Sequence, residues 1–312
     1  MNKNMNNIAV TGSPDYDKAF WSAMRGNNSV YDRIEIGRVQ DTGTYAVPSP
    51  AQRKFDTALT EQSVFRRIAS VVNALGSSYQ IMAKDTNDLA QWTPENSEIP
   101  IYNGMTDFTQ LPLGSHKLAA FVRLEEDFVQ DAAFNIEDYL MHRLAKNFAK
   151  AEDASFISGT GSDTPTGILA DTGGVEIGRA TASLTFDDIL ALYFSVKPEY
   201  RTNGSWLMND ETALYLRDLK DTAGNYLWRG TAESLFGKPV FITEFMPSVK
   251  AGTKPVVFGD FSYYWIAQRK CISIKTLTEK FTLYGQIGYL AFEFLDGKLV
   301  RPEAVKALQI TE

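Results

Sequence analysis

Few side chains in this sequence could carry acid–base or nucleophilic chemistry. The chain of 312 residues has two histidines, His116 and His142, and one cysteine, Cys271. Structural zinc sites need several cysteine and histidine ligands, so a site of that kind is excluded, and one cysteine cannot form a disulfide within the chain. No group of acidic residues has the spacing of a metal-binding loop. We therefore predict no metal and no cofactor.

A serine hydrolase is the enzyme class that these residues leave open. Ser162 lies in a glycine-rich turn, and His116 or His142 could act as its base. However, the Gly-x-Ser-x-Gly motif is absent, and the turn follows a predicted helix rather than a strand. The run Gly159-Thr160-Gly161 lacks the third glycine of a dinucleotide fingerprint, and no phosphate-binding loop is present. We predict a protein that is not an enzyme, with the hydrolase kept as an alternative.

The composition is that of an ordinary globular protein. Hydrophobic residues make up 44% of the chain and charged residues 22%, with a net charge of −7. This negative charge argues against a nucleic-acid-binding surface as the main function. No apolar run is long enough to cross a membrane, and no signal segment opens the chain. We therefore expect no membrane partner and expect the protein to be made in the cytoplasm.

A long helix, predicted over residues 135–158, must position the glycine-rich turn. Asn135 is a good N-cap, and the carboxylate of Asp138 can bond back to it. Apolar residues then recur at helical spacing until Gly159, which we predict to be the C-cap. A helix of about 23 residues would be roughly 35 Å long, about twice the usual length. We predict that it acts as a strut.

Residues 1–58 do not have the pattern of a core. One interpretation is a floppy terminus. The other is an arm that docks on another subunit, because Phe20, Trp21 and Tyr45 need burial somewhere. The sequence leaves both open.

Residues 76–113 form a second unusual segment, which is too long for an ordinary connection. They carry five acidic residues and one lysine, Lys84. An extended two-stranded loop that reaches away from the body fits this pattern, and a small insertion packed on its own domain is the alternative. If the loop reaches a neighbour, its candidate interface residues are Trp92, Glu95, Glu98 and Phe108.

The remaining segments read as ordered elements. Residues 117–124 alternate as a strand does, and residues 125–133 form a short helix. Helices capped by Thr185 and Asn209 alternate with strands up to about residue 275, which indicates one compact α/β subdomain. The tail is β, and Asp296-Gly297 predicts a hairpin turn.

Several segments, taken in order, resemble tailed-phage major capsid proteins, which have the Hong Kong 97 fold. Each piece is a weak signal alone, and the ordered set is a strong one. The segments are Gly43-Thr44-Tyr45-Ala46-Val47-Pro48, residues 59–69, residues 90–95, residues 116–119 and 125–131, Glu152-Asp153-Ala154 with the turn to Leu169, residues 206–209, 216–221 and 224–228, Gly237-Lys238-Pro239-Val240, and Phe258-Gly259-Asp260-Phe261.

The resemblance implies an α+β fold of the Hong Kong 97 type with peripheral and axial domains. Its expected parts are an N-terminal arm (1–58), a peripheral domain (59–75 and 114–171, with the spine helix 135–158), an extended E-loop (76–113), an axial domain (172–275), a peripheral hairpin (276–303) and a C-terminal strand of the axial domain (304–312).

The resemblance also implies a function. Such subunits assemble through pentamers and hexamers into an icosahedral shell that encloses double-stranded DNA without reading its sequence. The expected partners are other copies of the chain, a scaffold protein and a portal protein. The expected location is the virion capsid, assembled in the host bacterial cytoplasm. An encapsulin-type nanocompartment shell is the alternative within this fold. Lys84 has no identifiable partner, so no crosslinking residues are inferred.

Overall fold

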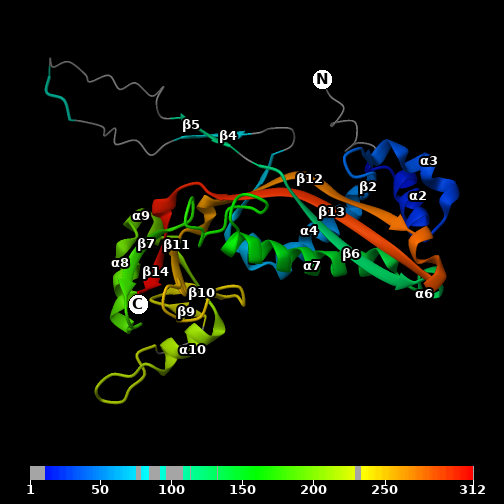
Figure 1. Ribbon diagram of the computed structural model, residues 1–312. Coiled ribbons are helices and arrows are strands. Elements are labelled where there is room, and N and C mark those ends of the chain that lie inside the picture. The colour runs from blue at the N-terminus through cyan, green and yellow to red at the C-terminus, as the bar shows by residue number, and fades with distance from the viewer. Residues whose placement is uncertain are drawn as a thin grey trace.

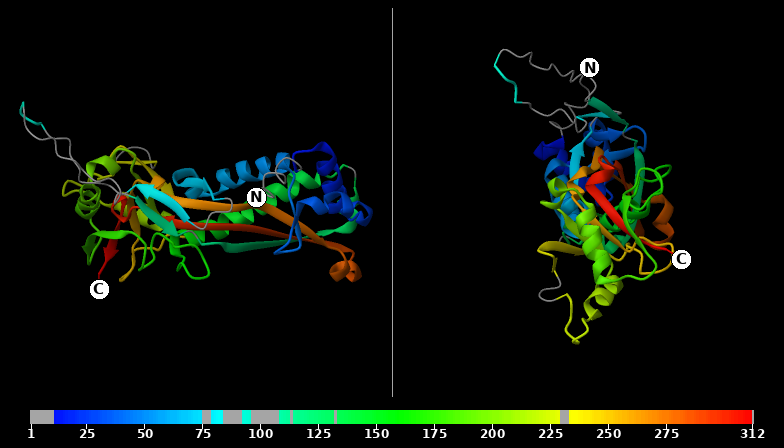
Figure 2. Two further views of the ribbon diagram at one scale, coloured as in Figure 1. Left: turned by 90° about the horizontal axis from the view of Figure 1, so that it is seen from above. Right: turned by 90° about the vertical axis from the view of Figure 1, so that its left-hand side faces the viewer.

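Two large sheets and one long helix form the framework of an elongated α+β molecule (Figure 1). The structure is a computed structural model that describes residues 11–74, 79–83, 92–95, 108–112, 114–131, 133–228 and 233–311. A small sheet with its helices lies at one end, and the N-terminal helices lie at the other. Figure 2 shows the same long axis from above.

The long sheet has the strand order β1-β2-β12-β13-β6, and β3 also pairs with β12. Its strands are β1 Arg38–Val39, β2 Thr44–Ala46, β3 Ser70–Asn73, β6 His116–Glu125, β12 Tyr264–Leu277 and β13 Gln286–Leu299. The helices and turns around it are α2 Pro14–Met24, η1 Asn28–Val30, α3 Tyr31–Ile34, η2 Glu35–Gly37, α4 Ser49–Gln62, α5 Val64–Ile68, α6 Glu126–Gln130, α7 Ile136–Ser158 and η5 Glu279–Tyr284.

The small sheet has the strand order β7-β14-β11-β8-β10-β9. Its strands are β7 Glu176–Thr181, β8 Ser205–Met208, β9 Ser234–Leu235, β10 Lys238–Ile242, β11 Val256–Gly259 and β14 Val305–Ile310. Its helices and short turns are α8 Phe186–Ser195, α9 Pro198–Arg201, α10 Asp210–Asp218, η4 Phe261–Tyr263 and η6 Pro302–Ala304. The predicted caps are confirmed, because Thr185 and Asn209 accept hydrogen bonds from the first turns of α8 and α10.

Helix α7 is the predicted long helix, and its start at the Asn135 cap is confirmed. Its end at the predicted C-cap, Gly159, is confirmed as well, but the reason for a glycine there differs from the expected one. Gly159 follows the helix with a φ of −64°, so it does not adopt the left-handed conformation that a C-cap glycine favours. Instead, a Cβ at Gly159 would lie 2.1 Å from the carbonyl oxygen of Pro165. Glycine is needed there because the turn folds back closely onto the helix end.

The expectation that residues 1–58 stay outside the core is wrong for the described part of this segment. Phe20 is 0% exposed and Tyr45 is 8% exposed, and both pack in the core beneath the long sheet. The hydroxyl of Tyr16 donates to the carbonyl of Ala46 at 2.6 Å. Trp21 is half-buried and packs edge-on against Phe20. The aromatic residues that needed burial find it within their own subunit.

The predicted hairpin at Asp296-Gly297 is also wrong. Both residues lie inside β13, where they pair with Ala267 and Ile266 of β12. The turn of this hairpin is η5, which joins β12 to β13. A Cβ at Gly297 would lie 2.9 Å from the ring of Phe156, so glycine here makes room for an aromatic side chain.

The structure also changes the expected end of the axial domain. Residues 264–275, assigned from the sequence to the axial domain, belong to β12 and therefore to the long sheet. The reason is the long antiparallel pairing of β12 with β13, which a local pattern cannot reveal.

The predicted two-stranded loop has an ordered base. Strand β4, Tyr79–Ala83, pairs antiparallel with β5, Phe108–Pro112, and Ala83 lies opposite Phe108. Both strands form a separate sheet, apart from the two larger ones. Glu98 and most of the residues between β4 and β5 lie outside the described residues; residues 92–95 are described.

The described helices include none that is both long and apolar enough to span a membrane. The stability of α7 should come from the packing of its buried side chains in the two cores.

Leu144→Ala tests this packing. Leu144 is fully buried in α7, so its truncation should lower the free energy of unfolding by roughly 2–5 kcal/mol. The exposed neighbour Arg143→Ala is the matched control and should change it by less than about 0.5 kcal/mol. Urea unfolding followed by circular dichroism measures both. A near-zero effect of Leu144→Ala would contradict the packing described here.

Candidate functional site

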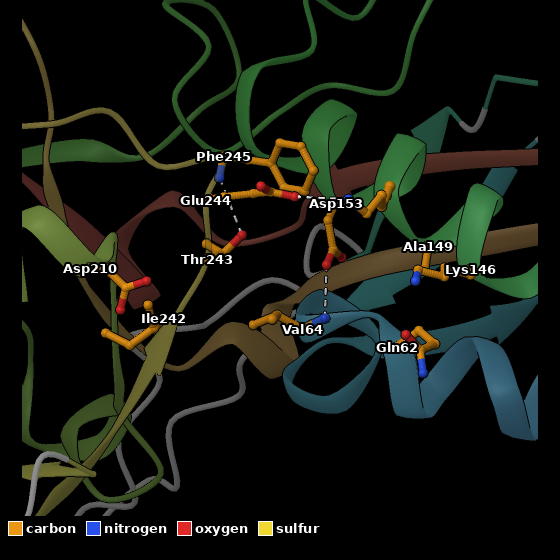
Figure 3. Close-up of a pocket in the computed structure, with 11 residues that line it drawn as sticks. Gln62, Val64, Lys146, Ala149, Asp153, Asp210, Ile242, Thr243, Glu244 and Phe245 are labelled. Atoms are coloured by element: carbon orange, nitrogen blue, oxygen red, sulfur yellow. Dashed lines mark hydrogen bonds and ion pairs between the residues drawn. The ribbon is translucent and has the colours of Figure 1, made fainter.

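A pocket lies between α7 and the small sheet, where the two halves of the molecule meet (Figure 3). We call it the α7 pocket, and its cavity volume is about 270 Å³. Helix α7 and the segment after β10 form opposite sides of it. Its lining residues are Gln62, Val64, Lys146, Ala149, Lys150, Asp153, Asp210, Ile242, Thr243, Glu244 and Phe245.

Asp153 joins α7 to α5 at the inner side of this pocket. Its Oδ1 accepts a hydrogen bond from the hydroxyl of Ser63 at 2.6 Å and one from the amide of Phe65 at 3.2 Å. Its Oδ2 accepts from the amide of Val64 at 2.9 Å (Figure 3). Burial raises the pKa of Asp153, and these three hydrogen bonds oppose that rise. A carboxylate from one helix thus satisfies the free N-terminal amides of another.

Beside it, Arg66 of α5 forms a buried ion pair with Glu152 of α7. Arg66 Nε donates to Glu152 Oε2 at 2.7 Å, and Nη2 donates to Oε1 at 2.8 Å. This two-point geometry is the strongest that an arginine and a carboxylate can make. The same Nη2 also donates to Glu293 Oε1 of β13 at 3.2 Å. One guanidinium therefore connects α5, α7 and β13, and we call Arg66, Glu152, Asp153 and Glu293 the buried clamp.

The buried clamp has three carboxyl groups and one guanidinium group. Its excess negative charge is reduced if Glu293 stays protonated. Burial first, and the charge of Glu152 second, raise the pKa of Glu293 from an ordinary 4.5 to about 8, although Arg66 opposes the rise. Among the described residues, Glu293 Oε2 has no hydrogen-bond partner. We therefore expect a neutral Glu293 near pH 7, which leaves Arg66 and Glu152 as a balanced pair.

The outer face of α7 is basic. Arg143, Lys146 and Lys150 are exposed and follow one another at helical spacing. Lys150 lies 3.4 Å from Glu244, across the pocket, and both side chains are exposed. We call these three cations the α7 ridge. They stand out in a chain whose net charge is −7.

Of the residues predicted to contact other subunits, some are buried within their own subunit and others are exposed. Phe20 and Tyr45 are buried within the subunit, so those two predictions are wrong. Trp92 is fully exposed, with an exposed fraction of 102%, and Glu95 is exposed as well. The backbone of Phe108 is placed in β5.

The residues of the hydrolase alternative do not form a catalytic arrangement. His116 Nε2 lies 3.4 Å from Asp296 Oδ1, and His142 Nδ1 lies 2.8 Å from the carbonyl oxygen of Asp138. Neither histidine is hydrogen-bonded to Ser162 in the described part of the chain. Cys271 is a free cysteine and is exposed. Over the same residues, no group of acidic, histidine and cysteine side chains could hold a metal ion.

Comparison with known proteins identifies the class of protein. The profile of the phage capsid family matches residues 43–310. The probable major capsid protein gp17 of Mycobacterium phage D29 is 26% identical over 286 residues, which cover 87% of this chain and 82% of the relative.

Solved structures agree with this match. A chain from the capsid of an empty GTA particle, solved with C5 symmetry, is 30% identical with a TM-score of 0.69, over 80% of this chain and 90% of that one. A structure from Gordonia phage Cozz is 13% identical with a TM-score of 0.56, over 80% of this chain and 86% of that one, and shows the shared fold alone.

The chain is a structural capsid protein rather than an enzyme. It belongs to the phage capsid family, and the predicted Hong Kong 97-type fold is confirmed.

The buried clamp predicts a pH dependence of stability. Between about pH 4.5 and 8 the folded protein keeps a proton on Glu293 that the unfolded chain releases, so this group makes stability fall as pH rises. The slope is at most about 1.4 kcal/mol per pH unit. Glu293→Gln copies the neutral carboxyl group and removes this contribution.

Urea unfolding of both proteins at several pH values between 5 and 8 measures the effect. The variant should gain stability relative to the wild type as pH rises. A level difference for Glu293→Gln would show that Glu293 is ionised in the folded protein.

Proposed function

We propose that copies of this protein assemble through pentamers and hexamers into an icosahedral shell that encloses double-stranded DNA. The observation that carries the proposal is the GTA capsid chain, which shares 30% of its residues and most of its fold with this chain and comes from an assembled capsid solved with C5 symmetry. Five-fold rings of one chain are closed head-to-tail contacts, and these need two different surfaces on each subunit.

The subunit offers exposed apolar side chains at both of its ends, as such contacts require. Leu190 and Phe194 of α8 are exposed beside the small sheet, and Leu283 and Tyr284 are exposed at the η5 turn of the β12–β13 hairpin. Exposed apolar groups of this size on a folded chain mark surfaces that other proteins cover. Their positions fit a subunit that meets neighbours at both ends.

DNA enclosure is proposed without sequence reading. The acidic net charge argues against base-specific DNA binding, and the phage relatives point to a particle of the virion type. The same relatives favour a phage-type shell over an encapsulin-type nanocompartment. A scaffold protein, a portal protein and assembly in the host bacterial cytoplasm complete the proposed setting, with the virion capsid as the final location.

The loop between β4 and β5 is proposed to lie over a neighbouring subunit. Trp92 and Glu95 are exposed in the isolated chain, and an isolated two-stranded hairpin is marginally stable in water. Glu98 and Phe108 belong to the same proposed contact. Since the loop is rich in acidic residues, the surface beneath it should be basic, and the α7 ridge is such a surface.

Electron microscopy of the purified protein tests the main proposal. We expect closed shells or five- and six-membered rings, and nuclease-resistant DNA in shells purified from cells that make all the particle proteins. A protein that stayed monomeric at high concentration, with and without a scaffold, would contradict it.

Replacing residues 80–110 with a short Gly-Ser linker tests the role of the loop. The shortened subunit should remain soluble and unfold cooperatively, because β4 and β5 belong to neither large sheet. It should fail to build closed shells under conditions in which the unaltered chain, as the control, builds them. Assembly of the unaltered chain should also weaken with added salt, because exposed charge pairs are screened over roughly 8–10 Å.

Two results would contradict this reading of the loop. Closed shells of normal size from the shortened chain would show that the loop is not an assembly element. Loss of cooperative unfolding would show that the loop belongs to the core of its own subunit.

A further inference from the structure

We propose that the α7 pocket is the receptor for Trp92 of a second copy of this chain, with Glu95 of that copy paired to Lys146. This inference rests on the proposed assembly into shells and adds the contact that the loop makes. It names one anchoring side chain, one pocket and one charge pair.

Trp92 is the side chain that most needs a partner. It has an exposed fraction of 102%, so no described part of its own subunit covers it. A tryptophan side chain can bury on the order of 150–250 Å², and it is among the residues that most often dominate the energy of a protein interface. Trp92 lies between β4 and β5, which pair in a sheet of their own, separate from the two large sheets.

The α7 pocket has the size and the walls that an indole ring requires. Its volume of about 270 Å³ exceeds that of the ring, and Val64, Ala149, Ile242 and Phe245 supply apolar contacts. Glu244 also lines the pocket and carries a carboxylate that can accept the indole N–H (Figure 3). A ring with one polar edge therefore suits this mixed lining better than a purely aliphatic side chain does.

Both signs of charge line the pocket, with Lys146 and Lys150 on α7 and Asp210 and Glu244 on the side of the small sheet. An acidic side chain of the second copy would therefore pair on the α7 side. Glu95 follows Trp92 closely in sequence, and Lys146 lines the pocket on the exposed face of α7. Among the described residues, neither Lys146 nor Arg143 takes part in an ion pair, whereas Lys150 faces Glu244. Exposed pairs add little energy, so the buried ring would supply affinity and the charges would set the orientation.

The buried clamp explains why this pocket is preformed. Asp153 fixes the start of α5, and with it Val64, against α7. Ile242, Thr243 and Phe245 on the opposite side belong to the end of β10 and the segment after it. Because side chains held by packing and hydrogen bonds lose little freedom on binding, a preformed pocket binds a rigid ring efficiently.

DNA is the competing occupant of this face. Phosphate groups would bind the cations of the α7 ridge, but they would leave the apolar walls of the pocket uncovered. The exposed Trp92 and the acidic character of its loop favour a second copy of the chain.

A disulfide between subunits tests the contact directly. In the chain carrying Cys271→Ser, the pair Thr93→Cys and Gln62→Cys places one thiol beside Trp92 and one at the pocket, and it keeps the ring that the contact needs. Oxidised shells should give a ladder of covalent oligomers on a non-reducing gel. The control pair Thr93→Cys and Lys18→Cys should give none, because Lys18 is exposed on α2, at the end of the molecule opposite the small sheet (Figure 1).

The outcomes separate this inference from the proposed function. Closed shells without the Gln62 ladder, or with an equal ladder from the Lys18 control, would overturn the contact and leave the shell proposal intact. Absence of shells and rings from the Cys271→Ser parent and from the wild type would overturn both.

A charge exchange provides an independent test. Glu95→Lys and Lys146→Glu should each lower the yield of shells by about tenfold, and the double variant should restore it, because only a direct pair is repaired by exchange. If the double variant assembles no better than the single ones, the pair is not formed. If Lys146→Glu instead reduces only the DNA retained in normal shells, the α7 ridge faces DNA and the inference is wrong.

Discussion

Helix α7 is the element on which the rest of the molecule depends, because it supplies side chains to both cores. Leu140, Leu144 and Phe148 pack beneath the long sheet, and Phe156 and Ile157 pack in the core of the small sheet. A helix is a stiff rod of fixed rise per residue, so a single helix that enters two cores sets the spacing between them. The buried clamp lies where the helix passes from one core to the other.

The chemistry of the clamp suits that position. Breaking one partner of a buried ion pair leaves an uncompensated charge, which costs about 3–5 kcal/mol, so such a cluster resists small displacements. The cluster joins α5, α7 and β13, which come from three distant parts of the sequence. Its excess carboxylate, Glu293, is accommodated by a raised pKa. The clamp therefore holds the two halves of the subunit in one arrangement, and the α7 pocket is a consequence of that arrangement.

The described side chains of this subunit suit contacts between copies of the chain better than they suit catalysis. Its two histidines are engaged with Asp296 and with the backbone of Asp138, and its exposed features are apolar side chains at both ends, a basic helix face and an exposed tryptophan. These are the properties of a protein whose function is to contact copies of itself. Membership of the phage capsid family gives the same conclusion from an independent direction.

The sequence by itself determined the local elements and the family. Asn135, Thr185 and Asn209 cap helices where a side-chain oxygen can meet free backbone amides, and that interaction lies within a few residues. Alternation predicted β6, and the ordered motifs predicted the Hong Kong 97-type fold. The sequence also identified Trp92 and Glu95 as candidate interface residues in a segment that has no core of its own.

Only the tertiary structure decided what depends on distant contacts. Asp296-Gly297 has the local signature of a turn, but pairing with β12 and the ring of Phe156 place it within a strand. The aromatic residues of α2 find their core under strands that come near the end of the chain. Glu152 and Asp153 look like solvated helix charges until Arg66 and the start of α5 are brought against them. The α7 pocket likewise combines residues from α4 to the segment after β10, because burial and pairing are properties of the folded chain rather than of any local segment.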